Sequence, residues 1–393
     1  MVFHLGSDCR DIINKIGGNE AFGGRLRSSF AIDHLIDCMA ECNMSSLKGD
    51  ITEEKRSKKE SIERSTEVVL KSKLRLRKKH KISVIIPVYN KMEFLDQCLE
   101  TVENQSLRDI EIICIDDGST DDSLEILKKH ARNDKRIRVI SQKNIGVGLT
   151  RDRGIEESNS EYICFMDPDD YYPSINVLEV LYLVAKQNGA LIAGGSWSED
   201  RKGEIKTEFN GIYSKYVFEK DGFIDYEDYQ FDYGYHRFIY NRKMIIKNNI
   251  YFPSYRRFQD PPFFVKAMVT ARRFYAVKKQ SYRYRFGHQK IEWERSEVCN
   301  GLIRGLIDNL CLSSNNNLAV LHKITVDRLN NDYSKILVNA IKSEEGSELL
   351  DLLRYANECV NWKLLSTTMP EVTNDNCLSV LVRALDGKMI EKN

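Results

Sequence analysis

The feature that most constrains the fold is an alternation of apolar runs and helical segments between residues 82 and 170. Four runs are rich in β-branched residues, and the segments between them carry apolar residues at helical spacing. These runs are ISVIIPVYN, EIICIDDG, IRVISQ and EYICFMDPDD, which begin at residues 82, 111, 137 and 161. Strands that alternate with helices of this length predict a parallel α/β sheet with right-handed crossovers.

Polar residues stand at the ends of these predicted strands. Tyr89 and Asn90 follow the first strand, Asp116 and Asp117 follow the second, and the acidic segment 167–170 follows the fourth. Ligands of open parallel sheets bind beyond the carboxyl ends of the strands. The sequence therefore predicts a binding site along this edge of the sheet.

The segment Asp167-Pro168-Asp169-Asp170 places three carboxyl groups within four residues. Such groups repel one another and need a cation or hydrogen-bond donors nearby. Hard oxygen ligands suit Mg²⁺ or Mn²⁺, which could bridge a diphosphate. The alternative is a solvated turn in which Asp170 caps the following helix.

Two further loops have the composition of a nucleotide site. In DDGSTD, Asp116 or Asp117 could accept from a base or a ribose hydroxyl, or Ser119 or Thr120 could cap a helix. In NIGVGLTRDRG, glycines allow close approach and Arg151 could pair with a phosphate, although a plain junction between loop and helix is the alternative. The sequence has neither a G-x-G-x-x-G fingerprint after the first strand nor a P-loop motif.

Changes in composition divide the chain into three predicted domains. Residues 1–80 form a helical and basic N-terminal extension, 81–290 an α/β domain, and 291–393 a helical region with amphipathic stretches. Residues 47–81 contain 13 basic and 6 acidic residues, a net charge of +7. The most basic part, 71–81, is either a solvated linker or a peripheral contact with anionic lipid at the inner face of the cell membrane.

Composition excludes several classes of protein. The 59 basic and 58 acidic residues nearly cancel, which argues against a nucleic-acid binder. The mean hydropathy is −0.44, and no long apolar run or apolar leader is present, so we expect a cytosolic protein. The ten cysteines lack paired metal spacing and are interpreted as reduced, mostly buried thiols.

Taken in order and at this spacing, ISVIIPVYN, EIICIDDGSTDDS, NIGVGLTRDRG and YICFMDPDDYYP resemble the family 2 glycosyltransferases with the GT-A fold. The resemblance is strong over residues 82–175 and weaker to about residue 290. It implies a nucleotide-diphospho-sugar donor, a divalent metal and inversion at the anomeric carbon.

The resemblance also implies roles for individual residues. The segment Pro87 to Asn90 would belong to the nucleotide site, with Tyr89 near the base, and Asp116 or Asp117 would contact the uracil or the ribose. Arg151 would line the nucleotide pocket. Asp167 would face the ribose or the metal, and Asp169 would be the principal metal ligand.

Inverting transfer needs a carboxylate that takes the proton of the acceptor hydroxyl. By resemblance, the candidate base is Asp260 in the segment RFQDPPFF, where Gln259 stands in place of the usual Glu. The alternative, which does not exclude the base, is that Asp260 caps the helix beginning at Pro261.

The segment SYRYRFGH supplies the last candidates. By the same resemblance, Arg283 or Arg285 would neutralise the leaving diphosphate, and His288 would complete the metal shell.

These inferences predict a metal-dependent inverting glycosyltransferase that uses Mn²⁺ or Mg²⁺. It would move a sugar from a UDP-sugar to a glycan or lipid-linked acceptor of a bacterial surface polysaccharide such as a capsule or lipooligosaccharide. The alternatives are a catalytically silent scaffold and a sugar nucleotidyltransferase. Apolar stripes on the C-terminal helices are consistent with a homodimer.

Overall fold

The computed structural model describes residues 79–371 apart from 289–291, 294 and 342–345, together with residues 373, 378, 382 and 383. The predicted helix before residue 47 and the basic segment as far as residue 78 lie outside these residues. The described residues belong to a single compact unit. None of the helices described has the length and apolarity that a membrane span requires.

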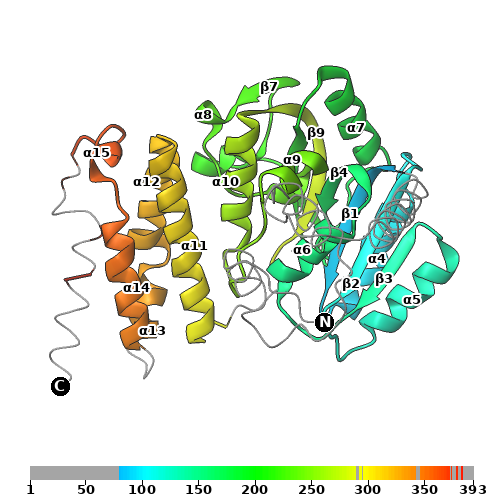
Figure 1. Ribbon diagram of the computed structural model, residues 1–393, viewed down its shortest axis with the longest axis horizontal. Helices are drawn as coiled ribbons and strands as arrows, with labels where there is room; N and C mark the ends of the chain where they lie inside the picture. The colour runs from blue at the N-terminus through cyan, green and yellow to red at the C-terminus, as the bar shows by residue number, and fades with distance from the viewer. Residues whose placement is uncertain are drawn as a thin grey trace, which may run out of the picture. The chain divides into compact units, whose positions relative to one another are not determined.

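A mixed nine-stranded sheet forms the centre of the fold (Figure 1). Its strand order is β3-β2-β1-β4-β8-β5-β9-β7, and β6 pairs with β5. The first four strands are β1 (His80–Val88), β2 (Ile110–Asp116), β3 (Ile137–Ser141) and β4 (Ser160–Phe165). They pair in parallel, as the apolar runs predict.

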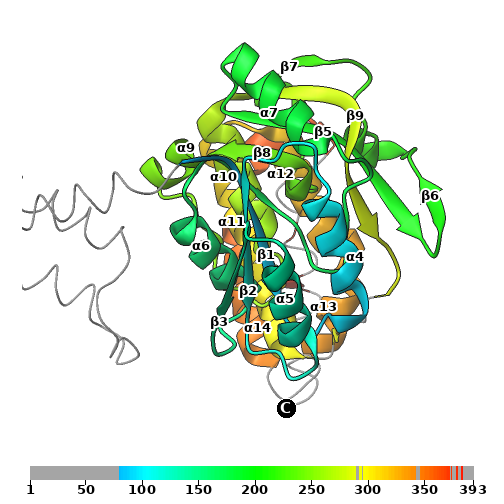
Figure 2. The same cartoon turned by 90° about the vertical axis from the view of Figure 1, so that its right-hand side faces the viewer.

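Helices cover both faces of this parallel half. The helices α4 (Met92–Glu103) and α5 (Ser123–Asn133) lie on one face, and α6 (Val147–Glu157) lies on the other (Figure 2). Right-handed crossovers require this arrangement, because the chain first moves outward from β1 to β3 and then returns to β4. Gly154 lets α6 approach β1 closely, since a Cβ at this residue would lie 2.3 Å from Ile85 Cγ2.

The second half of the sheet is less regular than the first. Antiparallel pairs join β4 to β8, β8 to β5 and β9 to β7, whereas β5 and β9 are parallel. The sheet as a whole is therefore mixed, and its first four strands are the part that the apolar runs predicted. The elements of this half are α7 (Val177–Asn188), β5 (Ile192–Arg201), β6 (Glu204–Lys206), β7 (Gly222–Asp225), α8 (Tyr226–Tyr229), β8 (Phe238–Asn241), α9 (Arg242–Lys247), α10 (Asp260–Ala271) and β9 (Arg273–Arg285), with 3₁₀ turns at Gly211–Tyr216 and Tyr235–Arg237.

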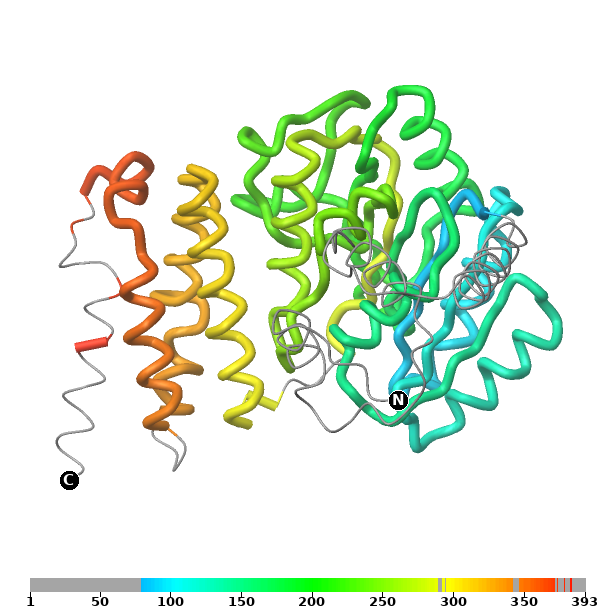
Figure 3. Tube along the Cα trace, in the orientation of Figure 1, coloured from blue at the N-terminus to red at the C-terminus, as the bar shows by residue number. Residues whose placement is uncertain are grey.

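After β9 the chain continues as helices, coloured yellow to red in Figure 3. They are α11 (Ser296–Asn315), α12 (Ala319–Asp327), α13 (Ser334–Ile341), α14 (Gly346–Glu358) and α15 (Trp362–Leu365). These helices have a hydrophobic core separate from that of the sheet. A π-helical turn at Arg328–Asp332 separates α12 from α13.

A buried ion pair joins the helices to the sheet. Arg328 in the π-helical turn donates to both oxygens of Asp232, at 2.6 and 2.9 Å, and Asn309 of α11 donates to Asp232 at 2.7 Å. The side chains of Arg328 and Asp232 are 1% and 0% exposed. The arginine also lies 3.9 Å from the centre of the Tyr233 ring. The π-helical turn therefore places the Arg328 guanidinium beside the Asp232 carboxylate.

We predict that Arg328→Ala destabilises the fold by about 3–5 kcal/mol, because it leaves a buried carboxylate without its partner. Arg354→Ala is the matched control, since Arg354 pairs with Asp351 at the surface and such pairs contribute about 0–1 kcal/mol. Urea unfolding of both variants measures the difference. Equal losses in the two variants would contradict a structural role for the buried pair.

Candidate active site

A cavity of about 700 Å³ opens at the carboxyl ends of β1 and β4. The chain order of the parallel strands reverses between these two strands, which is where open α/β sheets bind ligands. Seven of the residues to which the sequence assigned a role in the site line the cavity: Pro87, Tyr89, Asp117, Arg151, Asp167, Asp169 and His288. Residues from the four sequence motifs and from the segment 254–259 thus meet at one place.

Asp117 fixes the glycine-containing loop before α6. Its Oδ1 accepts from the backbone N–H of Ile145 and from Gln142 Nε2, and its Oδ2 accepts from the N–H of Gly146. The preceding Asp116 is also buried, but it accepts from Ser119 and Ser141 and does not line the cavity. Of the two acids, Asp117 is therefore the one placed to meet a ligand.

Arg151 presents a buried guanidinium to the cavity. The group lies 5.2 and 5.3 Å from the ring centres of Tyr235 and Phe252, and its Nη2 donates to Asp167. Its Nε and Nη1 are buried without a hydrogen-bond partner in the described part of the chain. Because unpaired buried donors are costly, this arginine is suited to an anionic or hydroxyl-bearing ligand.

Cationic groups hold Asp167 in its ionised form. Its Oδ1 lies 2.8 Å from Arg151 Nη2, and its Oδ2 lies 3.0 Å from His236 Nε2. Burial alone would raise the pKa of Asp167, but Arg151 and His236 outweigh burial and hold the pKa well below its ordinary range.

Asp169 is neutralised by a different pair of groups. Lys91 Nζ and His288 Nε2 each lie 2.7 Å from its Oδ2, and the side chain of Asp169 is 2% exposed. Burial would raise the pKa of this carboxyl as well, but His288 and Lys91 lower it overall. The two aspartates are thus both charged and both close to the cavity.

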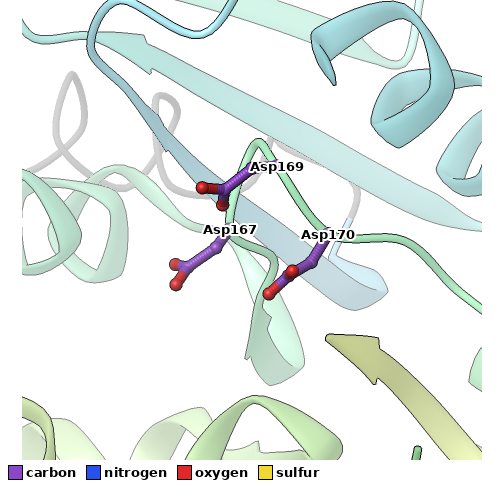
Figure 4. Close-up of side chains that lie close together, drawn as sticks. All are labelled: Asp167, Asp169 and Asp170. Carbon is purple, nitrogen blue, oxygen red and sulfur yellow. The ribbon is translucent and has the colours of Figure 1, made fainter. Parts of the chain in front are cut away.

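Asp170 differs from its two neighbours. Figure 4 shows the three side chains on the loop, with Asp170 on the limb that lies away from Asp167. Asp170 accepts from the Tyr282 hydroxyl at 2.8 Å and from the Arg285 backbone N–H at 2.7 Å, both on β9. Burial, followed by the charges of Asp169 and Asp167, raises its pKa well above the ordinary value. It does not cap a helix, since α7 begins at Val177 after Asn176.

The donor atoms at this loop fit a divalent cation. Carboxylate oxygens of Asp167, Asp169 and Asp170 lie within 4.8 Å of one another, and hard oxygen ligands are those that Mg²⁺ and Mn²⁺ prefer. His288 contacts Asp169, and its Nδ1 is buried without a partner among the described residues. Since Asp170 is held by β9, the residues best placed to hold a metal are Asp167, Asp169 and His288.

Several predicted site residues lie away from the cavity wall. Asn90 accepts from the backbone N–H of Thr120 and so joins the first two loops. Arg283 donates to Ser198 and Gln280. Arg285 donates from Nε to the backbone carbonyl of Asp169 and packs over Phe94 and Tyr171, so it supports the acidic loop from behind.

Asp260 is the first residue of α10, and Gln259 is the residue before the helix. The sequence alternative placed Asp260 before the helix, as its cap. In the structure Gln259 holds that position, one residue earlier. Gln259 lines the cavity, whereas Asp260 is half-buried beside it. The charge of Asp260 also acts on Arg151. Burial lowers the pKa of Arg151, but Tyr235, Asp167 and Asp260 together raise it above its ordinary value.

Sequence reasoning missed two residues that contact the acidic loop. Lys91 reaches Asp169 from the segment after β1, and His236 reaches Asp167 from the turn before β8. Neither residue belongs to a spacing pattern that could have identified it.

Comparison with known proteins agrees with this geometry. The sequence profile described as Glycosyl transferase family 2 matches residues 83–248. EpsJ of Bacillus subtilis, an uncharacterized glycosyltransferase, is 34% identical over 210 residues, which cover 52% of this chain and 60% of EpsJ. Glycosyltransferase GlyG of Streptococcus pneumoniae is 28% identical over 300 residues, covering 72% of this chain and 95% of GlyG.

Two further similarities bear on the site. The cholesterol galactosyltransferase of Borreliella burgdorferi is 46% identical over 112 residues, covering 28% of this chain and 31% of that enzyme. The chain thus spans less than two thirds of the length of EpsJ and of this enzyme. The structure of S. aureus TarS 1–349 in complex with UDP-GlcNAc has a TM-score of 0.58 at 19% identity, covering 72% of this chain and 82% of that one.

The fold is that of the GT-A glycosyltransferases, with a mixed sheet flanked by helices and followed by a helical region. Residues 83–248 of the chain match the profile of glycosyl transferase family 2.

The neighbour of Arg151 on α6 also shapes the site. Asp152 accepts from the backbone N–H of Phe252 at 2.9 Å and so holds the chain that leads to the cavity residues 254–257. Burial, with a smaller contribution from Glu156, raises the pKa of Asp152 to about 7.

The raised pKa of Asp152 predicts that the stability of the fold depends on pH. Between about pH 4 and pH 7 the folded protein binds more protons at Asp152 than the unfolded chain does, so this group makes stability fall as pH rises. We predict that Asp152→Asn, which keeps an acceptor for Phe252, removes this part of the decline. Urea unfolding at pH 5 and pH 8 measures it. A difference between wild type and variant that is the same at both pH values would contradict the prediction.

Proposed function

We propose that this protein is a metal-dependent, inverting glycosyltransferase. It transfers a sugar from a UDP-sugar to a hydroxyl of a glycan or lipid-linked acceptor in the synthesis of a bacterial surface polysaccharide. The observation that carries the proposal is the single cavity in which Arg151, Asp167, Asp169 and His288 meet at the reversal of strand order. The names of EpsJ, GlyG and the cholesterol galactosyltransferase support sugar transfer, and the TarS complex supports a UDP-sugar.

In this proposal the chain's own residues orient the donor. Tyr89 and Asp117 line the part of the cavity assigned to the nucleoside, and the unpaired N–H groups of Arg151 face an anionic or hydroxyl group of the donor. Asp169, with Asp167 and His288, would hold Mn²⁺ or Mg²⁺, which supplies positive charge to the diphosphate. Lys91 adds a cation beside the same carboxylate.

Asp260 is the proposed general base. The acceptor oxygen forms a bond to the anomeric carbon while the bond from that carbon to the diphosphate oxygen breaks. The electron pair leaves with the diphosphate, and the acceptor proton passes to the Asp260 carboxylate. Attack opposite to the leaving group inverts the configuration. Gln259, which lines the cavity, can orient the acceptor through its amide but supplies no charge.

The metal role predicts a difference between neighbouring aspartates. We expect Asp169→Asn to weaken Mn²⁺-dependent UDP binding by about tenfold or more, because it removes a charged ligand. Asp170→Asn should keep this binding within about twofold, since the Asp170 carboxyl is held by β9 and does not line the cavity. Calorimetry with UDP, with CDP and GDP as controls, with and without Mn²⁺, measures both. A folded wild-type sample that binds no nucleotide would refute the proposed function and favour the silent scaffold.

The base role predicts a loss of rate without a loss of donor binding. We expect Asp260→Asn to lower UDP-sugar turnover by about 10²–10⁴-fold while the affinity for UDP stays unchanged. The control is Asp228→Asn, an exposed aspartate in α8. Release of UDP from UDP-GlcNAc and other UDP-sugars measures turnover. Wild-type turnover in Asp260→Asn would exclude this residue as the base.

A further inference from the structure

A second cavity of about 640 Å³ lies between the segment 254–256 and the helices α11 and α14. Its wall includes Ser254, Tyr255 and Arg256, and the same three residues line the first cavity. The two cavities therefore meet along one segment of chain. A ligand longer than a single sugar could occupy both.

The shared segment is fixed against α11. A Cβ on Gly301 would lie 2.9 Å from Arg257 N, and a Cβ on Gly305 would lie 2.3 Å from Phe258 O, so only glycine permits this close approach. Phe258 is buried in the hydrophobic core of the C-terminal helices. Burial and the neighbouring Asp308 of α11 raise the pKa of Tyr255 to about 12. Because of these contacts, the helices hold the wall that the two cavities share.

The remaining lining of the second cavity carries a hydrogen-bonded set of polar side chains. Arg304 Nε donates to Asn300 Oδ1 at 2.7 Å, and Asn300 Nδ2 donates to Glu348 Oε1 at 2.9 Å. A second pair of opposite charge, Arg256 and Glu297, lies at 3.9 Å. These four charged side chains are 44–69% exposed, so they can contact a ligand.

The balance of charge in the second cavity indicates which class of ligand it can bind. Two arginines and two glutamates offer strong donors and strong acceptors together with no net charge. A phosphorylated or acidic chain would meet two carboxylates, and an isolated cation would meet two guanidinium groups. Sugar hydroxyls both donate and accept, so they can satisfy both kinds of group.

We propose that the second cavity binds uncharged saccharide units of the acceptor, next to the unit that receives the new sugar. This inference rests on the proposed function and specifies its acceptor as a neutral glycan of more than one residue. The helical region then contributes directly to acceptor binding through Asn300, Arg304 and Glu348.

The test compares two double variants with wild type. Arg304→Gln/Glu348→Gln removes two of the four charges of the cavity, one of each sign. Arg354→Gln/Asp351→Asn changes a surface pair of similar exposure, 49% and 71%, which does not line it. The probe is an array of neutral and anionic bacterial-type oligosaccharides, applied to the full chain with UDP and Mn²⁺. UDP affinity is measured separately by calorimetry.

We expect wild type and the Arg354/Asp351 variant to bind neutral oligosaccharides of two or more sugars. The Arg304/Glu348 variant should lose this binding by about tenfold or more, with its UDP affinity within about twofold of wild type. Preference for anionic glycans, absence of glycan binding in a protein that binds UDP, or unchanged binding in the Arg304/Glu348 variant would each overturn the inference. Failure of wild type to bind UDP would instead refute the proposed function.

Discussion

The site depends on the neutralisation of buried negative charge at one loop. Asp167 and Asp169 stand two residues apart at the end of β4, where burial penalises their ionised forms. Arg151 and His236 compensate the first, and Lys91 and His288 compensate the second. Each compensating group comes from a different element, so the loop keeps its charge only when α6, the turn before β8 and the segments after β1 and β9 are all in place.

The same requirement explains why the helical region matters to the site. The turn that carries His236 follows Asp232, whose charge is matched by Arg328 from the C-terminal helices. Phe258, just before the proposed base, is buried among those helices. The segments that carry His236 and Phe258 are therefore both held by the C-terminal helices, outside the sheet. The positions of the acidic loop and of α10 are therefore set by packing against the sheet and against the C-terminal helices.

Local patterns predicted the parallel half of the fold well. The four apolar runs became β1 to β4 because strands buried on both faces are continuously apolar, and this placed Tyr89, Asp117 and Asp169 around one cavity. The mixed half was harder, because its short antiparallel strands are set by long-range pairing. The break at Arg328 also has no local signal, since it depends on Asp232, 96 residues earlier in the chain.

Contacts between distant residues account for the other differences. Lys91 and His236 are single residues without a motif, and only the folded chain brings them to Asp169 and Asp167. Arg283 and Arg285 seemed equally suited to the diphosphate, yet neither lines the cavity, and their guanidinium groups donate to Gln280 and to the Asp169 carbonyl. Residue type suggested the chemistry at these positions, but contacts in the folded chain determined which groups could take part.

The buried ion pair has a practical consequence for shortening the chain. Asp232 and Phe258 belong to the sheet-containing part by sequence, but each is completed by residues beyond 295. A fragment that ends after β9 would keep the buried Asp232 without the Arg328 that pairs with it. It would also expose Phe258, in the loop before α10, which the C-terminal helices otherwise cover. Its aggregation or poor expression would then reflect a badly chosen end point and would say nothing about whether the sheet can bind a nucleotide.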